Sequence, residues 1–311
     1  MPPFAQTEID RQLPSGDEIF LDHVAHFVRG ADAASRALAR AGFAPTPQSI
    51  QVNPDVAVGT QLTGTGTGNV TAMFARGYIE VLFKTADTAL GREFDAMLAR
   101  YAGIHLAAFA VADAHSARER LAASDFRVRP LVKMQRPVET AAGDDVAAFT
   151  IARVEPDVMP EGRIQMLTHH TEATVWQPRW LKHPNTAIGL IDIVIAVEDV
   201  QEAAARFSRF TDRAATAMSG AALIRLDRGG IYLIAHDRAA EKLPEVPATT
   251  LPYILGYAVQ VQSLAAAEAA VESADLEWRA IEGGLVACFP SELGEGAWFF
   301  VEDAAALPWR R

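Results

Sequence analysis

Apolar and polar positions along the chain repeat one order of strand and helix patterns four times. The first stretch has a strand, a helix and three strand candidates separated by glycine-containing turns, at 20–28, 31–41, 61–63, 69–74 and 78–83. The later stretches open with apolar runs at 104–111, 190–197 and 255–261. Four copies of one supersecondary unit indicate internal duplication, so the sequence predicts an α+β fold of four βαβββ units.

Two such units are expected to form one domain, since a chain of 311 residues with 50% hydrophobic residues can bury more than one core. The predicted division has a flexible arm, a first domain of units one and two, a linker, and a second domain of units three and four, at 1–17, 18–168, 169–186 and 187–311.

Two polar residues interrupt the apolar strands of the first unit. His23 lies in the opening strand, and Glu80 lies in the closing strand on the face that also carries Tyr78 and Leu82. An unpaired carboxylate among such neighbours is costly to bury, so Glu80 requires a cation, a proton or a strong hydrogen-bond donor nearby. The pair is therefore the first candidate for a functional site.

Charge and cysteine content narrow the partners and the compartment. A formal net charge of −11 and a pI near 5.2 argue against broad binding to nucleic acid or to an anionic membrane, which leaves a small molecule as the expected partner. The single cysteine, Cys288, cannot form an intramolecular disulfide and fits a reducing compartment. No apolar run reaches the roughly 18 residues of a membrane-spanning helix, and residues 1–16 lack a secretion-signal pattern. We expect a cytoplasmic protein.

Several short motifs give the chain a resemblance to a known superfamily. They lie at 21–24, at 78–82, and in the linker at 169–171, Trp176 and 183–185. The chain resembles the vicinal oxygen chelate superfamily, and within it the glyoxalase-like proteins with four βαβββ modules. The resemblance implies curved mixed sheets, and it is compatible with glyoxalase-type lyases and isomerases, extradiol dioxygenases, fosfomycin-type transferases and metal-free drug-binding proteins. A fold alone does not choose among these chemistries.

In this superfamily, metal ligands come from the first and last strands of paired modules. Aligning the modules on Val28, Val111, Val197 and Val261 gives the first-strand position as His23, Leu106, Asp192 and Gly256. The last-strand position is Glu80, Gln165, Tyr232 and Phe299. Only the first module has both a histidine and a carboxylate. The third and fourth modules are therefore expected to form a degenerate domain without metal, which serves stability, forms a homodimer or acts as a lid.

His105 offers a third metal ligand. It lies one residue before Leu106, and a β-bulge between His105 and Val111 would turn it to the face of His23, whereas without a bulge it faces the other way. The predicted metal ligands are His23, Glu80 and His105. This set suits a divalent metal ion such as Fe(II), Mn(II), Zn(II) or Ni(II). The candidates for substrate binding are Gln165, as a weak neutral fourth group, Arg163 and Tyr78.

Three other histidines have structural interpretations. His26 is an odd number of residues from His23 and projects to the opposite face of the strand. His169 and His170 are neighbours that face opposite ways, which favours packing and hydrogen bonding in the linker over a ligand pair.

The leading hypothesis is a bacterial-type, metal-dependent glyoxalase-like enzyme, a lyase, isomerase or dioxygenase, that acts on a small substrate with neighbouring oxygens. Lactoylglutathione lyase itself is disfavoured, because the amide of Gln165 cannot shuttle a proton. The alternative is a metal-free small-molecule binding or resistance protein of the bleomycin resistance type. Module pairing stays open: each half can close on itself, or the first and fourth modules can meet.

Overall fold

The computed structural model describes residues 11–58, 61–242, 246 and 250–311, with side chains described outside 54–63. The first module consists of β1 (Ile19–Phe27), α1 (Ala31–Arg40), β2 (Ser49–Val58), β3 (Gln61–Met73) and β4 (Tyr78–Lys84), and is followed by α2 (Ala89–Leu98). The second consists of β5 (Gly103–Val111), α3 (Ala114–Ala123), β6 (Val132–Thr140), β7 (Gly143–Arg153) and β8 (Arg163–His169). The linker carries α4 (Glu172–Val175) and η1 (Pro178–Trp180).

The second half repeats the same order of elements. The third module consists of β9 (Ala187–Val197), α5 (Val200–Thr211), β10 (Ala215–Met218), β11 (Ala221–Arg225) and β12 (Gly230–Ala235), and α6 (His236–Lys242) follows. The fourth consists of β13 (Tyr253–Val261), α7 (Leu264–Ser273), β14 (Trp278–Ile281), β15 (Gly284–Cys288), η2 (Ser291–Leu293), β16 (Ala297–Val301) and η3 (Ala304–Ala306). The predicted α+β fold of four βαβββ modules is confirmed.

The first module differs from the prediction in how its strands divide. The candidates at 61–63 and 69–74 belong to the single strand β3, and β2 had no candidate. The glycines of β3 suggested turns, yet Gly68 lies within the strand, where an added Cβ would come 2.7 Å from the Phe83 ring. Glycine here marks a close approach by a neighbouring strand's side chain rather than a turn.

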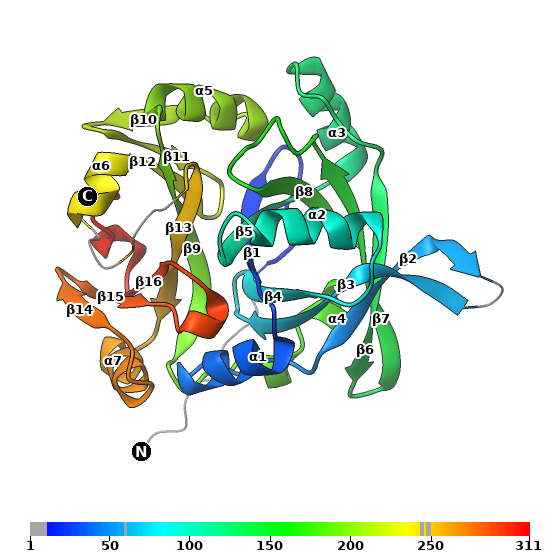
Figure 1. The fold of residues 1–311 in the computed structure, drawn as a ribbon, viewed down its shortest axis with the longest axis horizontal. Helices are drawn as coiled ribbons and strands as arrows, with labels where there is room; N and C mark the ends of the chain where they lie inside the picture. Colours follow the sequence, from blue (N-terminus) through cyan, green and yellow to red (C-terminus); the bar gives the residue numbers. More distant parts are fainter. Residues whose placement is uncertain (1–10, 59–60, 243–245, 247–249) are drawn as a thin grey trace.

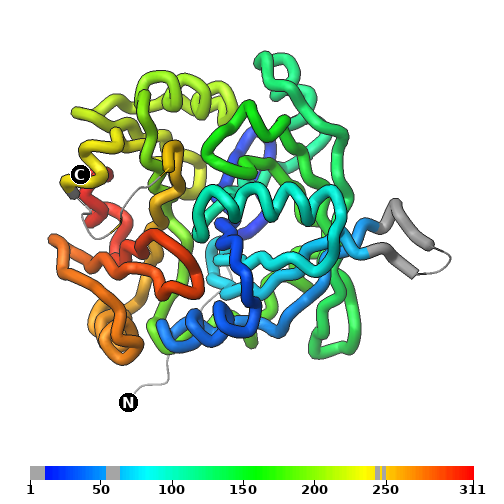
Figure 2. The backbone as a smooth tube through the Cα atoms, viewed as in Figure 1, coloured from blue at the N-terminus to red at the C-terminus, as the bar shows by residue number. Residues whose placement is uncertain are grey.

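Modules one and two form a closed ring of eight strands. Their order is β1-β4-β3-β2-β6-β7-β8-β5, and β5 pairs back onto β1. The second half has the order β10-β11-β12-β9-β13-β16-β15-β14 and meets the first where β5 pairs with β13. The two halves lie side by side in Figure 1, and Figure 2 shows the blue-to-green half of the chain beside the half that runs from yellow-green to red. Module one therefore pairs with two, and three with four, whereas the domain boundaries remain a prediction.

A glycine precedes the last strand of each module at an equivalent place. An added Cβ would lie 2.6 Å from the Asp22 carbonyl oxygen at Gly77 and 2.5 Å from the His105 carbonyl oxygen at Gly162. Gly229 and Gly296 approach the carbonyl oxygens of Ile191 and Leu255 in the same way. Each carbonyl belongs to the residue just before the aligned first-strand position, so the geometry supports the alignment of the four modules.

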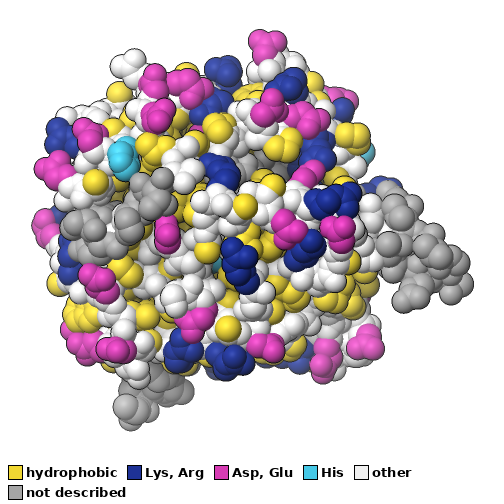
Figure 3. Space-filling model, in the orientation of Figure 1, with side chains coloured by type: hydrophobic (Ala, Val, Ile, Leu, Met, Phe, Trp, Pro, Cys, Tyr) yellow, Lys and Arg dark blue, Asp and Glu magenta, His cyan; other side chains and the backbone are white. Residues whose placement is uncertain are grey.

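Helix α2 covers part of the ring and is fixed by aromatic packing. Phe94 of α2 stacks on Phe27 of β1, with ring centroids 4.6 Å apart. Both belong to an apolar cluster with Leu82, Leu106 and Met134, which supports the inside of the ring. On the face shown in Figure 3, acidic and basic side chains are interspersed.

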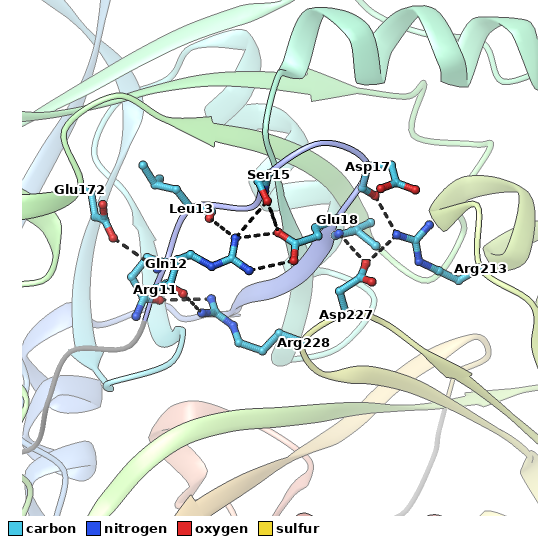
Figure 4. A network of polar contacts seen from close by, with 11 residues as sticks. Arg11, Gln12, Leu13, Ser15, Asp17, Glu18, Glu172, Arg213, Asp227 and Arg228 are labelled. Atoms are coloured by element: carbon cyan, nitrogen blue, oxygen red, sulfur yellow. Dashed lines mark hydrogen bonds and ion pairs between the residues drawn. The ribbon is translucent and has the colours of Figure 1, made fainter.

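Residues 11–18 are tied to both halves of the molecule. Arg11 donates to both carboxylate oxygens of Glu18 at 2.7 and 2.8 Å, and Arg228 donates to the Arg11 carbonyl oxygen at 2.7 Å (Figure 4). Gln12 donates to Glu172 through its backbone and to the Ala75 carbonyl oxygen through its side chain. Of the flexible arm predicted for 1–17, residues 1–10 lie outside the described part, and several of residues 11–17 make hydrogen bonds of this kind, while the arm itself remains a prediction.

Candidate functional site: a cavity lined by arginines

A cavity of about 40 Å³ lies within the strand ring of the first half. Each of the eight strands of the ring contributes at least one lining residue. The polar lining residues are His23, Gln51, Asn69, Tyr78, Glu80, Gln135, Arg136, Arg153, Arg163 and Gln165. The cavity thus brings together His23 and Glu80 with all three predicted substrate-binding residues.

His23 is held by a buried carboxylate. Its Nδ1 lies 2.6 Å from Asp22 Oδ1, and the Nε2 of His169 lies 2.8 Å from Asp22 Oδ2. Burial alone would raise the pKa of Asp22, but the two histidines outweigh it and hold that pKa well below its usual range. Because the ionised Asp22 accepts a hydrogen bond from Nδ1–H of His23, the Nε2 is the ring nitrogen that can accept a proton.

A β-bulge in β1 allows the adjacent residues Asp22 and His23 to contact each other. The register between β1 and β5 passes from Leu21 opposite Phe109 to His23 opposite Ala108, which leaves Asp22 without a partner in the ladder. The His23 ring is fixed from its other side by Tyr78, whose ring stacks on it with centroids 4.4 Å apart. Burial, with nearby Asp22 and Glu80, raises the pKa of Tyr78, which therefore remains a neutral phenol.

Glu80 faces His23 across the cavity. Its Oε2 lies 3.7 Å from the Nε2 of His23. Its Oε1 accepts hydrogen bonds from Gln51 at 3.2 Å and from Asn69 at 2.5 Å. The strong donors that the sequence analysis required for this carboxylate are therefore neutral amides of β2 and β3, and the carboxylate is aimed at His23.

Three buried arginines give the cavity an excess of positive charge. Arg136, Arg153 and Arg163 are 8%, 7% and 8% exposed, and Glu80 is the one carboxylate among the lining residues. Burial lowers the pKa of Arg153 to about 9 and that of Arg163 to about 10, and also lowers that of Arg136. All three remain protonated at neutral pH, so the cavity favours an anion.

The three arginines differ in their partners. The Nε of Arg153 donates to Gln165 Oε1 at 2.9 Å. The Nη2 of Arg163 has no hydrogen-bond partner in the described part of the chain, with Glu93 Oε2 at 3.9 Å. Within the same described residues, Arg136 makes neither a hydrogen bond nor an ion pair. A buried guanidinium without an ion pair, such as that of Arg136, is costly, so a ligand that supplies negative charge would be stabilised here.

The prediction that His105 faces the site is wrong. A register shift does occur, from Ala25 opposite Leu106 to His26 opposite Ile104, but its unpaired residue is His105 itself and not a residue between His105 and Val111. However, Leu106 lines the cavity at this position, and His105 occupies the place that Asp22 has in module one. Its Nε2 donates to the Tyr101 carbonyl oxygen at 2.8 Å. The imidazole packs on the Tyr101 ring, with centroids 3.9 Å apart, outside the cavity.

The cavity does not fit the divalent metal that the resemblance implies. Of the three predicted ligands, His23 and Glu80 reach the cavity, and no group of three His, Cys, Asp or Glu side chains able to hold a metal occurs among the described residues. The oxygen of Gln165 already accepts from Arg153. Three guanidinium groups in place of further ligands would repel a cation.

The remaining histidines follow the sequence interpretation in part. His26 lies on the opposite face, where Nδ1 donates to the Leu293 carbonyl oxygen at 3.0 Å and Nε2 accepts from Tyr257 at 2.9 Å. His170 bonds Thr150. His169, however, supports the site through Asp22. The signal for it was the strand alternation itself, since Gln165, Leu167 and His169 share one face of β8.

The sequence analysis also missed Arg136 and Arg153. Both lie on strands of the long β6–β7 hairpin, which was predicted only as a hairpin region. Alternation places Arg136 with Met134, and Arg153 with Ile151, on the inner face. The signal was an arginine at an inward position of each strand.

A family comparison decides the identity of the fold. The model of the Glyoxalase-like domain family matches residues 21–211, which is more than half of the chain. The chain belongs to the glyoxalase-like domain family. The family match bears out the resemblance to glyoxalase-like proteins of the vicinal oxygen chelate superfamily. No curated protein sequence matches this glyoxalase-like protein.

Solved structures resemble the glyoxalase-like protein over almost its whole length. A hypothetical protein from Staphylococcus aureus has a TM-score of 0.63 at 9% identity, covering 91% of this chain and 98% of its own. A mutant of 4-hydroxymandelate synthase from Streptomyces coelicolor has a TM-score of 0.51 at 14% identity, covering 91% and 92%. A fusion of a xylose isomerase-like TIM barrel with 4-hydroxyphenylpyruvate dioxygenase has 0.51 at 11%, covering 96% of this chain and 50% of its own. At these identities the likeness shows the fold alone.

In the second half of the glyoxalase-like protein, the C-terminal residues occupy the equivalent place. Trp309 stacks on Tyr232, with centroids 4.8 Å apart, and donates to Asp192 Oδ2 at 2.8 Å. Arg310 donates to both oxygens of Asp192, at 2.7 and 2.5 Å. Asp192 and Tyr232 correspond to His23 and Glu80, so the chain's own tail fills this site.

Among the described residues, no helix is long and apolar enough to cross a membrane.

Proposed function

We propose that this glyoxalase-like protein is an enzyme that removes a proton next to the carbonyl group of a small 2-oxo carboxylate, with arginine side chains holding the negative charge. The observation that carries the proposal is Arg136, a buried guanidinium without a bonding partner among the described residues, in a cavity that also contains His23. A carboxylate ligand would supply the missing counterion.

In this proposal His23 is the general base. Its Nε2 takes the proton from the substrate carbon, and the electron pair of the broken C–H bond moves onto the carbonyl oxygen to give an enolate. Asp22 holds the other ring nitrogen as its donor, as the buried aspartate does in catalytic triads. The imidazolium would then lie between Asp22 and Glu80, since Glu80 Oε2 is 3.7 Å from Nε2. Return of the proton to the neighbouring carbon or oxygen regenerates neutral His23.

The arginines would provide the electrostatic stabilisation. Negative charge that develops on the enolate oxygen is best stabilised by donors that are already desolvated and fixed in place. Arg163 and Arg136 have unused donor capacity toward neighbours in the described chain, and Arg153 is held by Gln165. A substrate with neighbouring carboxylate and carbonyl oxygens matches a site with several guanidinium groups.

The test is hydrogen exchange of pyruvate in D₂O, followed by the loss of its methyl signal in proton NMR. Protein treated with a chelator should accelerate exchange, and His23→Gln should lower the rate at least about 100-fold, the usual contribution of a general base. The exposed His115→Gln serves as the matched control and should exchange at the unmodified rate.

Two results would contradict the proposal. Exchange that requires added Zn(II), Mn(II) or Fe(II) would favour the metal-dependent enzyme. Binding of pyruvate without any exchange would favour a metal-free binding protein. The cytoplasmic location and a homodimer rest on sequence arguments and remain predictions.

A further inference from the structure

A second, apolar pocket lies directly beside the arginine cavity. It has a volume of about 430 Å³, roughly ten times that of the arginine cavity, which is about 40 Å³. Its walls include Leu90 of α2, Leu131 just before β6, and Val132 and Met134 at the start of β6. The exposed lining of this pocket is mainly apolar, whereas that of the arginine cavity is nearly half polar.

Two side chains form a shared wall between the two spaces. Met134 and Arg153 line both the arginine cavity and the apolar pocket. The wall is therefore one side chain thick. Met134 is unbranched, with several rotatable bonds, so it can move aside without breaking a hydrogen bond. Arg153 is fixed at its Nε by a hydrogen bond to Gln165.

The sizes of the two spaces restrict how one ligand can use them. A volume of about 40 Å³ has room for a compact polar group but not for a larger molecule. The arginines attract an anion, whereas the larger pocket offers apolar side chains. A ligand that satisfies both has a small anionic head joined to an apolar tail.

We infer that the substrate is an amphipathic 2-oxo carboxylate, whose head lies against Arg136 and Arg153 and whose apolar tail passes Met134 into the pocket beside Leu90. The inference rests on the proposed function for the chemistry of the head, and it adds the tail and the residues that recognise it. Leu90 and Leu131 are then specificity-determining residues, since they touch the part of the substrate that does not react.

The chain-length dependence of binding tests this inference. Calorimetry would compare pyruvate, 2-oxobutyrate, 2-oxohexanoate and 2-oxooctanoate with the unmodified protein. Each buried methylene should tighten binding about two- to fourfold, so 2-oxooctanoate should bind at least about 30-fold more tightly than pyruvate. Octan-1-ol, which lacks the carboxylate, should bind more weakly than 2-oxooctanoate.

A variant that blocks the apolar pocket tests whether the substrate tail binds there. Leu90→Trp fills the apolar pocket from a half-buried position on α2, so it should remove the gain from longer tails, and the four acids should then bind with similar affinity. The exposed Val146→Trp makes the same kind of change on β7, away from both spaces, and should keep both the affinity for pyruvate and the gain from longer tails.

The outcomes separate this inference from the proposed function. Equal affinity for all four acids, a chain-length gain that survives Leu90→Trp, or equally tight binding of octan-1-ol would overturn the amphipathic substrate while leaving the 2-oxo acid site intact. If no 2-oxo acid binds at all, the proposed function itself fails.

Discussion

The two halves of this protein use the same place in the fold in opposite ways. In the first half, His23 and Glu80 face a cavity with three buried arginines. In the second half, Asp192 and Tyr232 hold the positions that correspond to His23 and Glu80, and Trp309 and Arg310 of the same chain cover them. Arg310 thus satisfies the carboxylate of Asp192 in the second half, whereas Arg136 in the first half makes no ion pair within the described part of the chain. The two halves share one architecture, and their side chains decide which half can bind a ligand.

The largest expected effect distinguishes the two first-strand positions. His23→Gln should lower proton exchange at least about 100-fold, because a glutamine amide cannot accept the substrate proton. Asp192→Asn, at the corresponding position of the second half, should leave the exchange rate unchanged. The D₂O exchange assay on both variants measures this difference. A comparable loss of exchange in both variants would contradict the claim that the reaction takes place in the first half alone.

Removing the Trp309 side chain from the second half should lower the free energy of unfolding without affecting the ligand site of the first half. Trp309 is 5% exposed and packs on both Tyr232 and Phe299. Trp309→Ala should lower the free energy of unfolding by about 3–5 kcal/mol, because it leaves a cavity. Urea unfolding measures the loss, and pyruvate affinity should stay the same. A change below about 1 kcal/mol would mean that the tail is not an integral part of the second half.

The arginines of the two halves should respond differently to the same substitution. Arg310→Met leaves Asp192 buried with a lost ion pair and should destabilise the protein by about 3 kcal/mol. Arg136→Met removes an unpaired buried charge, so the free energy of unfolding should stay equal or rise, while pyruvate affinity falls at least about tenfold. Denaturant unfolding and calorimetry check both parts. Matching stability losses would contradict the claim that Arg136 is without an internal counterion.

Low pH should reduce the stability of the first half and of the linker before that of the second half. Burial lowers the pKa of His26, His105 and His183 to about 4 each, while the one histidine of residues 187–311, His236, is exposed. A histidine with a lowered native pKa binds its proton more readily when unfolded, so stability is lost as pH falls below about 6.5.

Between pH 7 and pH 5 each of these histidines should remove about 2 kcal/mol from the free energy of unfolding. Urea unfolding at both pH values measures the slope. His105→Gln should reduce the loss by about one third, and His115→Gln should not. A slope that His105→Gln leaves intact would show that His105 is not buried in its neutral form.

The sequence allowed the fold to be predicted more completely than the site. Four strand-helix repeats and the alignment of His23 with Asp192 follow from periodicity, because each strand must turn its apolar face to a core. Glu80 was found because a carboxylate among apolar residues is unexpected. His105 was misplaced because a bulge can be predicted from an extra residue, but the direction in which it turns a side chain depends on tertiary contacts such as the Tyr101 carbonyl.

The arginines were missed for a different physical reason. Arg136 and Arg153 lie on polar, half-buried strands, where an arginine is ordinarily solvated. Their burial arises from ring closure between β2 and β6 and between β1 and β5, which are contacts distant in sequence. Periodicity indicates which face of a strand is inward, but not which strands meet across the interior.

Calorimetric titration of pyruvate into chelator-treated protein tests the central claim most directly, that buried arginines and not a metal hold the substrate's charge. We expect the same affinity before and after chelator treatment, no gain on adding Zn(II), Mn(II) or Fe(II), and a loss of at least about tenfold in Arg136→Met. Binding that disappears with the chelator, returns with one of these ions, and persists in Arg136→Met would contradict it.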